Sequence, residues 1–300
     1  MLRKYTVQFG AAAAAAAGMV ASQSSPDSPA RCDKIYESGQ VLGRGVKLEL
    51  WKAKHKNVDV LDLESETIQT GLTRVRDFNA TGAKFVHVAN KLLRNVLESA
   101  LTQLPNDEDT VVTTPLGHKV KGVDYEEGVT VCGLALVERS LVSEQLQLLL
   151  KTTLPFDSAI GQLQLSPPGD SPGALAAVDL PDGIEDMHVI LLHPEFASFD
   201  VIQPAIQLLL KKGVSPDHIQ VVTLVTCPAA ADKFCATFGD VNLVTAAFDA
   251  ASDSQHRIVP GLGNFEKRYV GDDSGVVPDA AAGEDDDQAS AGWSSWWPFK

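Results

Sequence analysis

The 300-residue sequence has few cysteines and few basic residues, and each scarcity argues against a class of protein. Its four cysteines lie far apart, with no CxxC pair and no histidine at metal-ligand spacing: Cys32, Cys132, Cys227 and Cys235. A disulfide-built secreted scaffold and a structural zinc site are therefore not expected, and we expect buried, reduced thiols. Lys and Arg number 25 against 39 Asp and Glu, and this net charge of −14 argues against a nucleic-acid-binding surface.

The N-terminal region lacks acidic residues. Residues 1–26 carry Arg3 and Lys4 and pass through an alanine tract, Ala11 to Ala17, into a serine-rich stretch. This composition is typical of a mitochondrial targeting segment, although a secretory signal has the same outline. The apolar part is too short and too alanine-rich to predict a membrane span, and a membrane anchor stays an alternative. We expect a mitochondrial protein, with residues 27–55 as a linker or N-terminal extension.

The C-terminal region, residues 272–300, is acidic and ends in aromatic residues. Seven acidic side chains have only Lys300 to balance them: Asp272, Asp273, Asp279, Glu284, Asp285, Asp286 and Asp287. Such a segment buries too little apolar surface to order, so we expect a disordered tail. Its end fits a peptide that docks into a partner protein, through Trp293, Trp296, Trp297 and Phe299. An interfacial membrane anchor and a tail folded back on its own domain stay open.

Between these ends, apolar patterns predict alternating strands and helices. At the centre, Val189 to Leu192 predicts a buried strand, and apolar residues at helical spacing from Ile202 predict a helix that stops at Gly213. The same patterns predict strands at 58–61, 110–113, 129–137, 160–165, 220–225 and 241–248, and helices at 67–77, 83–104, 141–150 and 229–238. The alternation predicts an α/β fold whose mostly parallel sheet has helices on both faces.

In such a sheet, ligands bind at the carboxyl ends of the strands. The loops after Val137, Leu192 and Phe248 should therefore converge on one site. The loop after Leu192 lies where nucleotide-handling proteins hold phosphate, yet it lacks the glycines that allow close backbone approach. The position of this loop predicts a phosphate-binding site, whereas its residue types do not.

Several stretches, in order, resemble the uracil phosphoribosyltransferase family. Leu72–Asp77 is similar to its N-terminal arm, Thr114–Gly117 to its hood hairpin, and Val131–Val137 to its first core strand. Ile258–Phe265, with the residues up to Gly271, resembles its uracil-binding segment. The resemblance spans about residues 56–271 and implies a phosphoribosyltransferase type I-like α/β domain with a small N-terminal arm and hood hairpin. It also implies transfer of ribose 5-phosphate from phosphoribosyl pyrophosphate to uracil, with magnesium.

The phosphate loops depart from that family's pattern. In the loop after the central strand, His193 stands at an acidic position and Ser198, Phe199 and Asp200 replace part of a Thr-Gly-Gly-Ser end. Bulky side chains at two glycine positions prevent the backbone from closing around a 5′-phosphate, and Asp200 would repel that anion. This loop is therefore expected to be degenerate.

Two further loops depart in the same direction. After the first core strand, Glu138, Arg139 and Ser140 replace Arg-Ala-Gly, so an acid takes the place of a pyrophosphate-binding arginine. After the third core strand, Pro167 and Pro168 replace Arg-Asp and offer no donor. The uracil segment keeps its backbone turn, which predicts a vestigial uracil pocket at Val259, Gly261, Gly263, Asn264 and Phe265.

Two other groups of residues leave alternatives open. His193 with Glu195 and Asp200 could form a general base, or His193 could be a structural residue at a strand end. Arg74 and its neighbours Arg76 and Asp77 could bind an anion or serve packing and ion pairs.

The sequence favours a catalytically inactive family member. We expect no catalytic residues, metal or other cofactor, and a role as an accessory structural subunit of a large mitochondrial assembly, such as the mitochondrial ribosome or a respiratory complex. Its partners would then be protein subunits, and a homo-oligomer stays possible as an alternative. Two other functions remain open: a salvage uracil phosphoribosyltransferase that uses magnesium, and a pyrimidine-binding sensor.

Overall fold

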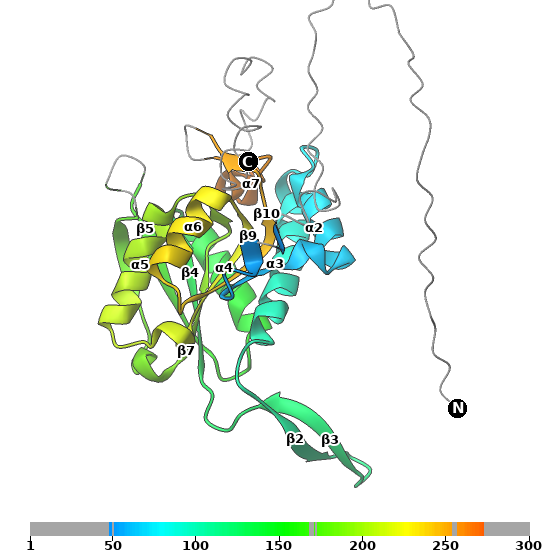
Figure 1. Ribbon diagram of the computed structural model, residues 1–300. Coiled ribbons are helices and arrows are strands. Elements are labelled where there is room, and N and C mark those ends of the chain that lie inside the picture. The colour runs from blue at the N-terminus through cyan, green and yellow to red at the C-terminus, as the bar shows by residue number, and fades with distance from the viewer. Residues whose placement is uncertain (1–47, 50, 168–170, 172, 254–256, 273–300) are drawn as a thin grey trace, which may run out of the picture. The chain divides into compact units, whose positions relative to one another are not determined.

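A computed structural model of the chain describes residues 48–49, 51–167, 171, 173–253 and 257–272 (Figure 1). Its eight-stranded sheet has the order β1-β10-β9-β7-β4-β5-β6, and β8 pairs with β9 beside that path. Every pairing is parallel except β5 with β6, which confirms the predicted mostly parallel sheet. The strands are β1 Val58–Val60, β4 Val131–Val137, β5 Ala159–Leu165, β6 Leu175–Asp179, β7 His188–Leu192, β8 Glu195–Phe196, β9 Ile219–Thr226 and β10 Asn242–Phe248.

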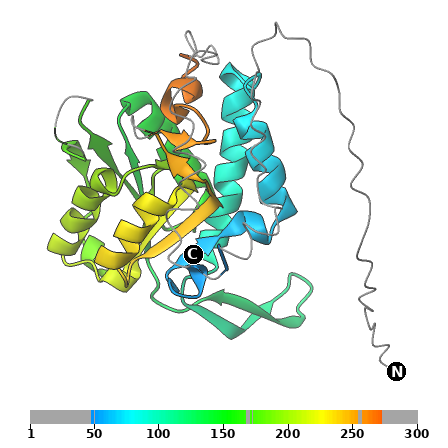
Figure 2. The ribbon, with the colours of Figure 1, turned by 45° about the horizontal axis from the view of Figure 1, so that its top comes forward.

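The sheet is covered on both faces. All residues of β4 and β9 are buried, which explains why these strands read as continuous apolar runs rather than as alternating patterns. One face packs against α2 (Glu66–Arg76), α3 (Gly82–Leu101), α4 (Ser140–Thr153) and α7 (Phe265–Tyr269). The other face packs against α5 (Phe199–Lys211) and α6 (Pro228–Thr237). Figure 2 shows the cyan α2 and α3 on the opposite side of the sheet from α5 and α6.

A separate hairpin, β2 (Asn106–Thr113) with β3 (Lys119–Tyr125), extends from the domain (Figure 1). Gly117 closes its turn with φ +80°, a backbone conformation that glycine adopts without strain. This hairpin lies at the predicted hood position. Among the described residues, no helix has the length and apolar character of a membrane span.

Some elements differ from the sequence prediction. The hairpin strand β3, the antiparallel edge strand β6, the short strand β8, the pair β11 (Ala251–Ser252) with β12 (Ile258–Val259), and α7 are additional to the predicted set. The predicted helices and strands are otherwise present, with ends shifted by a few residues. β11, β12 and α7 all belong to the segment after β10.

Candidate functional site

The predicted convergence of three loops is present at the carboxyl edge of the sheet. The loop after β4 makes hydrogen bonds to the segment 258–269 through the backbone of Glu138 and Arg139. The loop after β7 makes one through Glu195, and the loop after β10 makes one through Asp249. This segment, called here the closing segment, contains the predicted uracil pocket and the short helix α7. In each of these contacts a carboxylate accepts a backbone N–H.

Glu266 of the closing segment binds the loop after β4. Its Oε1 accepts the backbone N–H of Glu138 and its Oε2 that of Arg139, each at 2.8 Å. Arg139 is the N-cap of α4, so the carboxylate lies at the N-terminus of a fourteen-residue helix, where the helix dipole favours a negative charge. Burial raises the pKa of Glu266, and the two backbone N–H groups oppose that rise. The side chain of Glu266 thus occupies an anion-binding geometry.

Glu195 makes the second contact. Its Oε2 accepts the backbone N–H of Phe265 at 2.8 Å. Burial raises the pKa of Glu195 to about 7, with a further rise from the neighbouring charge of Glu266, while the Phe265 N–H and Arg268 act in the opposite direction. Two carboxylates with raised pKa values therefore lie beside the same short helix.

Glu195 makes the stability of the domain pH-dependent. Because its folded-state pKa is raised, its contribution is fully present below about pH 4.5 and is lost as the pH rises through about 7. A shift of this size corresponds to at most roughly 3 kcal/mol. We expect Glu195→Gln to match the wild type at pH 4.5 and to be the more stable protein at pH 8, by urea denaturation. Parallel pH profiles for the two proteins would contradict this assignment.

Asp249 makes the third contact. Its Oδ2 accepts the Gly261 backbone N–H at 2.9 Å, and its Oδ1 accepts from Nη2 of Arg76 at 2.7 Å. The Asp249 side chain is 2% exposed and that of Arg76 is 16% exposed, so the carboxylate of this ion pair is almost fully shielded from water. Gly261 has φ +61°, and a Cβ there would lie 2.1 Å from the carbonyl oxygen of Ile258, so only glycine fits.

Arg268 attaches the closing segment to the rest of the domain, and no structural role was predicted for it from the sequence. Its guanidinium donates to the carbonyl oxygens of Val75, Leu262, Asp77 and Ala80 at 2.6–3.0 Å. It also lies 4.1 Å from the ring centroid of Phe85. The arginine is 5% exposed and joins the closing segment to the connection between α2 and α3. The available signal was the resemblance of the residues up to Gly271 to the family's uracil-binding segment.

The residues predicted for the loop after β7 lie at the expected strand end, but their side chains have different surroundings. His193 is buried, and its Nδ1 lies 2.9 Å from the Leu136 carbonyl oxygen. Burial lowers its pKa. Ser198 is the N-cap of α5, and Asp200 is exposed in the first turn. Phe199 is buried and packs against Phe238, with ring centroids 5.8 Å apart. These contacts favour the structural interpretation of His193 over the general-base one.

The structure describes some of the other predicted residues, in the uracil segment and in the loop after β4, and leaves others outside its described ranges. Gly263 has φ +73°, and Asn264 caps α7 by accepting the Lys267 backbone N–H, so the uracil-segment turn is present. Arg139 pairs with Asp272 at 3.4 Å, and Ser140 begins α4. Pro168, the targeting segment and the aromatic docking residues of the tail lie outside the described residues.

The sheet order, the arm and the hairpin define an α/β domain of the phosphoribosyltransferase type. The family model described as "Uracil phosphoribosyltransferase" matches residues 63–271, so the chain belongs to that family. It is 29% identical to the uracil phosphoribosyltransferase of Saccharomyces cerevisiae over 219 residues, which cover 71% of this chain and 96% of the yeast protein.

Two further similarities extend this comparison. "Uridine kinase-like protein 5" of Arabidopsis thaliana is 33% identical over 199 residues, 66% of this chain, and the match spans only 41% of that relative. The chain thus covers about two fifths of the uridine kinase-like relatives that it matches. The solved structure of the AQ2163 protein from Aquifex aeolicus shares the fold, with a TM-score of 0.57 and 18% identity over 71% of this chain and 97% of that one.

The residues at this site do not fit phosphoribosyl pyrophosphate and magnesium as they stand. The backbone donors of the loop after β4 already bind Glu266. In the described part of the chain, no three His, Cys, Asp or Glu side chains are grouped so as to hold a metal ion. The donors Gly261 and Phe265 of the predicted uracil pocket also bind carboxylates of this chain.

Proposed function

We propose that this chain is a non-catalytic member of the uracil phosphoribosyltransferase family whose substrate site is held closed by its own carboxylates. One observation carries the proposal: the Glu266 carboxylate accepts the backbone N–H groups of both Glu138 and Arg139. The resemblance described above assigns that loop to pyrophosphate. Glu266 supplies the negative charge that a pyrophosphate group would bring.

An internal carboxylate is a strong competitor for a ligand. Because Glu266 is part of the folded chain, it meets these N–H groups at a high effective concentration, and no translational freedom is lost when it binds. A diphosphate would have to displace it and then lie beside two acids, Glu138 and the displaced Glu266. The loop after β7 offers no compensation, because Phe199 and Asp200 stand where the family pattern described above has glycines, and Asp200 adds a negative charge.

We expect no conversion of uracil and phosphoribosyl pyrophosphate to UMP and pyrophosphate by the purified chain with magnesium. The yeast uracil phosphoribosyltransferase, assayed in parallel, supplies the positive control. Glu266→Ala is also expected to be inactive, because Phe199 and Asp200 still occupy the glycine positions of the loop after β7. Turnover at ordinary enzyme rates, about 1 s⁻¹ or faster, would overturn the proposal and establish the salvage-enzyme alternative.

The salvage-enzyme function has one observation in its favour. The match to the yeast enzyme covers 96% of that protein, so no part of the catalytic domain is missing by length. A pyrimidine sensor is the remaining alternative. It predicts that uracil or UMP alone raises the melting temperature of the chain, whereas the closed site predicts no shift.

For the whole protein we propose an accessory structural role in a large mitochondrial assembly. The composition of residues 1–26 and the aromatic residues from Trp293 to Phe299 support this role. A sucrose gradient of gently solubilised organelle extract, probed with an antibody against the domain, tests it. Migration with a particle of ribosome or respiratory-complex size is the expected result. Migration as a free dimer or tetramer, or absence from mitochondria, would contradict it.

A further inference from the structure

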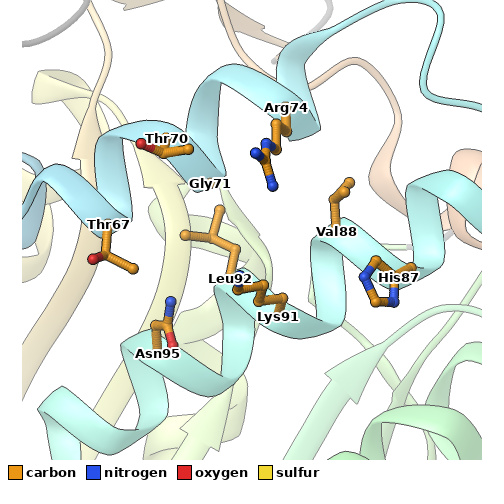
Figure 3. A pocket seen from close by; sticks show the side chains of 9 residues that line it. All are labelled: Thr67, Thr70, Gly71, Arg74, His87, Val88, Lys91, Leu92 and Asn95. Carbon is orange, nitrogen blue, oxygen red and sulfur yellow. The ribbon is translucent and has the colours of Figure 1, made fainter.

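A basic groove lies between α2 and α3, outside the site described above. It has a volume of about 210 Å³ and is lined by Thr67, Thr70, Gly71, Arg74, His87, Val88, Lys91, Leu92 and Asn95 (Figure 3). The lining contains two permanent cations and a histidine, and no acid. In Figure 3, Arg74 extends from α2 toward α3, on which His87 and Lys91 lie. This charge is unusual for a chain of net charge −14.

The cations of the groove are available for an anionic partner. Within the described ranges, neither Arg74 nor Lys91 takes part in an ion pair. By contrast, Lys84, which lies on α3 with Lys91, pairs with Asp77 at 3.7 Å. Both are exposed. Arg74 and Lys91 come from different helices, so one bound anion would join the two helices.

We infer that the acidic segment 279–287 of this same chain binds in the groove. Charge complementarity is the first argument, because Asp279, Glu284, Asp285, Asp286 and Asp287 face no base in their own segment. A run of four consecutive acids matches a groove with cations on both walls better than a single phosphate does. Side-chain donors from Thr67, Thr70 and Asn95 add hydrogen-bond partners for carboxylates.

The position of Gly271, which precedes the acidic segment in the sequence, is the second argument. The ideal Cβ of Gly271 would lie 4.0 Å from the Cα of Gly82, the first residue of α3. Lys91 lies nine residues further along that helix, which corresponds to roughly 14 Å of rise. Twelve residues separate Asp272 from Glu284, and a chain of that length has a root-mean-square span of roughly 19 Å. The acidic run is therefore tethered at the distance of the groove.

Because the acidic segment is attached to the domain, a weak charge interaction is enough to keep the groove occupied. Isolated surface ion pairs contribute about 1 kcal/mol or less, but a short tether gives the segment an effective concentration of about a millimolar or more. Bound there, the segment would present the following aromatic residues beside the α2–α3 face, where a partner protein could reach them.

Zero-length carbodiimide coupling of the full chain tests this inference. The reagent activates a carboxylate, which then forms an amide with the Lys91 Nζ and releases the urea of the reagent. Mass spectrometry is expected to find segment 279–287 joined to Lys91 at least about five-fold more often than to Lys212, the C-cap of α5, with the excess lost at about 0.5 M salt. Arg74→Glu should abolish the excess while Lys91 keeps its amine.

The matched control is Arg94→Glu. Arg94 is an exposed arginine of α3 outside the groove, so this variant changes the charge of the protein equally and should leave the Lys91 product unchanged. Unchanged circular dichroism and melting temperature verify that both variants fold. Equal coupling to Lys91 and Lys212, or an equal effect of the two variants, would overturn the inference. Mixed ¹⁴N–¹⁵N products at the statistical ratio of about 1:2:1 in an equimolar sample would also overturn it, because the tail would then bind a second copy.

Discussion

Arg268→Leu is expected to lower the free energy of unfolding by roughly 3–5 kcal/mol, enough to leave little folded domain. Leucine keeps the apolar contact with Phe85 but removes the guanidinium donors to four carbonyl oxygens, and the Asp77 oxygen keeps the Ala80 N–H as a donor. Buried carbonyl groups without donors lose their solvation and gain nothing in return. Urea denaturation, or the yield of soluble protein when the variant fails to fold, measures the effect.

Two substitutions show whether the arginine acts through its geometry. Arg268→Lys retains the charge but has three donors on one nitrogen, too few for carbonyls on opposite sides, so we expect a substantial part of the loss to remain. Lys267→Leu changes the adjacent, exposed cation of α7 and should alter stability by at most about 0.5 kcal/mol. Equal effects of Arg268→Leu and Lys267→Leu would show that the buried network contributes nothing.

Asp249→Ala is expected to cost about 3–5 kcal/mol, because it leaves the shielded Arg76 guanidinium without its carboxylate. It also removes the acceptor of the Gly261 N–H, so the closing segment loses one of its three attachments. The urea midpoint and the hydrogen exchange of the Gly261 amide measure the two consequences separately.

The pair can be tested by a double-mutant cycle. Because Arg76→Met removes the unpaired charge, Asp249→Ala should cost much less in that background, with a coupling energy of about 1–3 kcal/mol. Lys84→Ala breaks the exposed pair with Asp77 and should change stability by less than about 1 kcal/mol. Additive effects of Arg76→Met and Asp249→Ala would contradict the description of this ion pair.

The central strands of the sheet could be predicted from the sequence, whereas the edge strand β6 and the short helix α7 could not. β4 and β9 are buried on both faces, so packing demands largely apolar runs. β6 pairs on one side only, and four of its five residues are exposed, so its sequence carries no strand pattern. α7 has five residues, too few for a helical period to appear.

The site was predictable in position and not in contacts. Parallel topology places the loops after Val137, Leu192 and Phe248 at one edge, and the structure confirms that placement. Glu266 and Glu138, however, are 128 residues apart, and only the folded chain shows that a carboxylate meets those backbone donors. Residue comparison located the positions that depart from the family, and geometry located the carboxylate that binds the backbone N–H groups of the loop after β4.

The most direct test of the closed site is a calorimetric titration of the full chain with phosphoribosyl pyrophosphate and magnesium. The yeast enzyme is titrated in parallel, and Glu266→Ala is titrated as the variant whose loop donors are freed. The account predicts no binding heat and no rise in melting temperature for the wild-type chain at about 5 mM ligand. Saturable binding to the wild type with a Kd below about 100 μM would contradict it, because a ligand held that tightly must displace Glu266 from the Glu138 and Arg139 N–H groups.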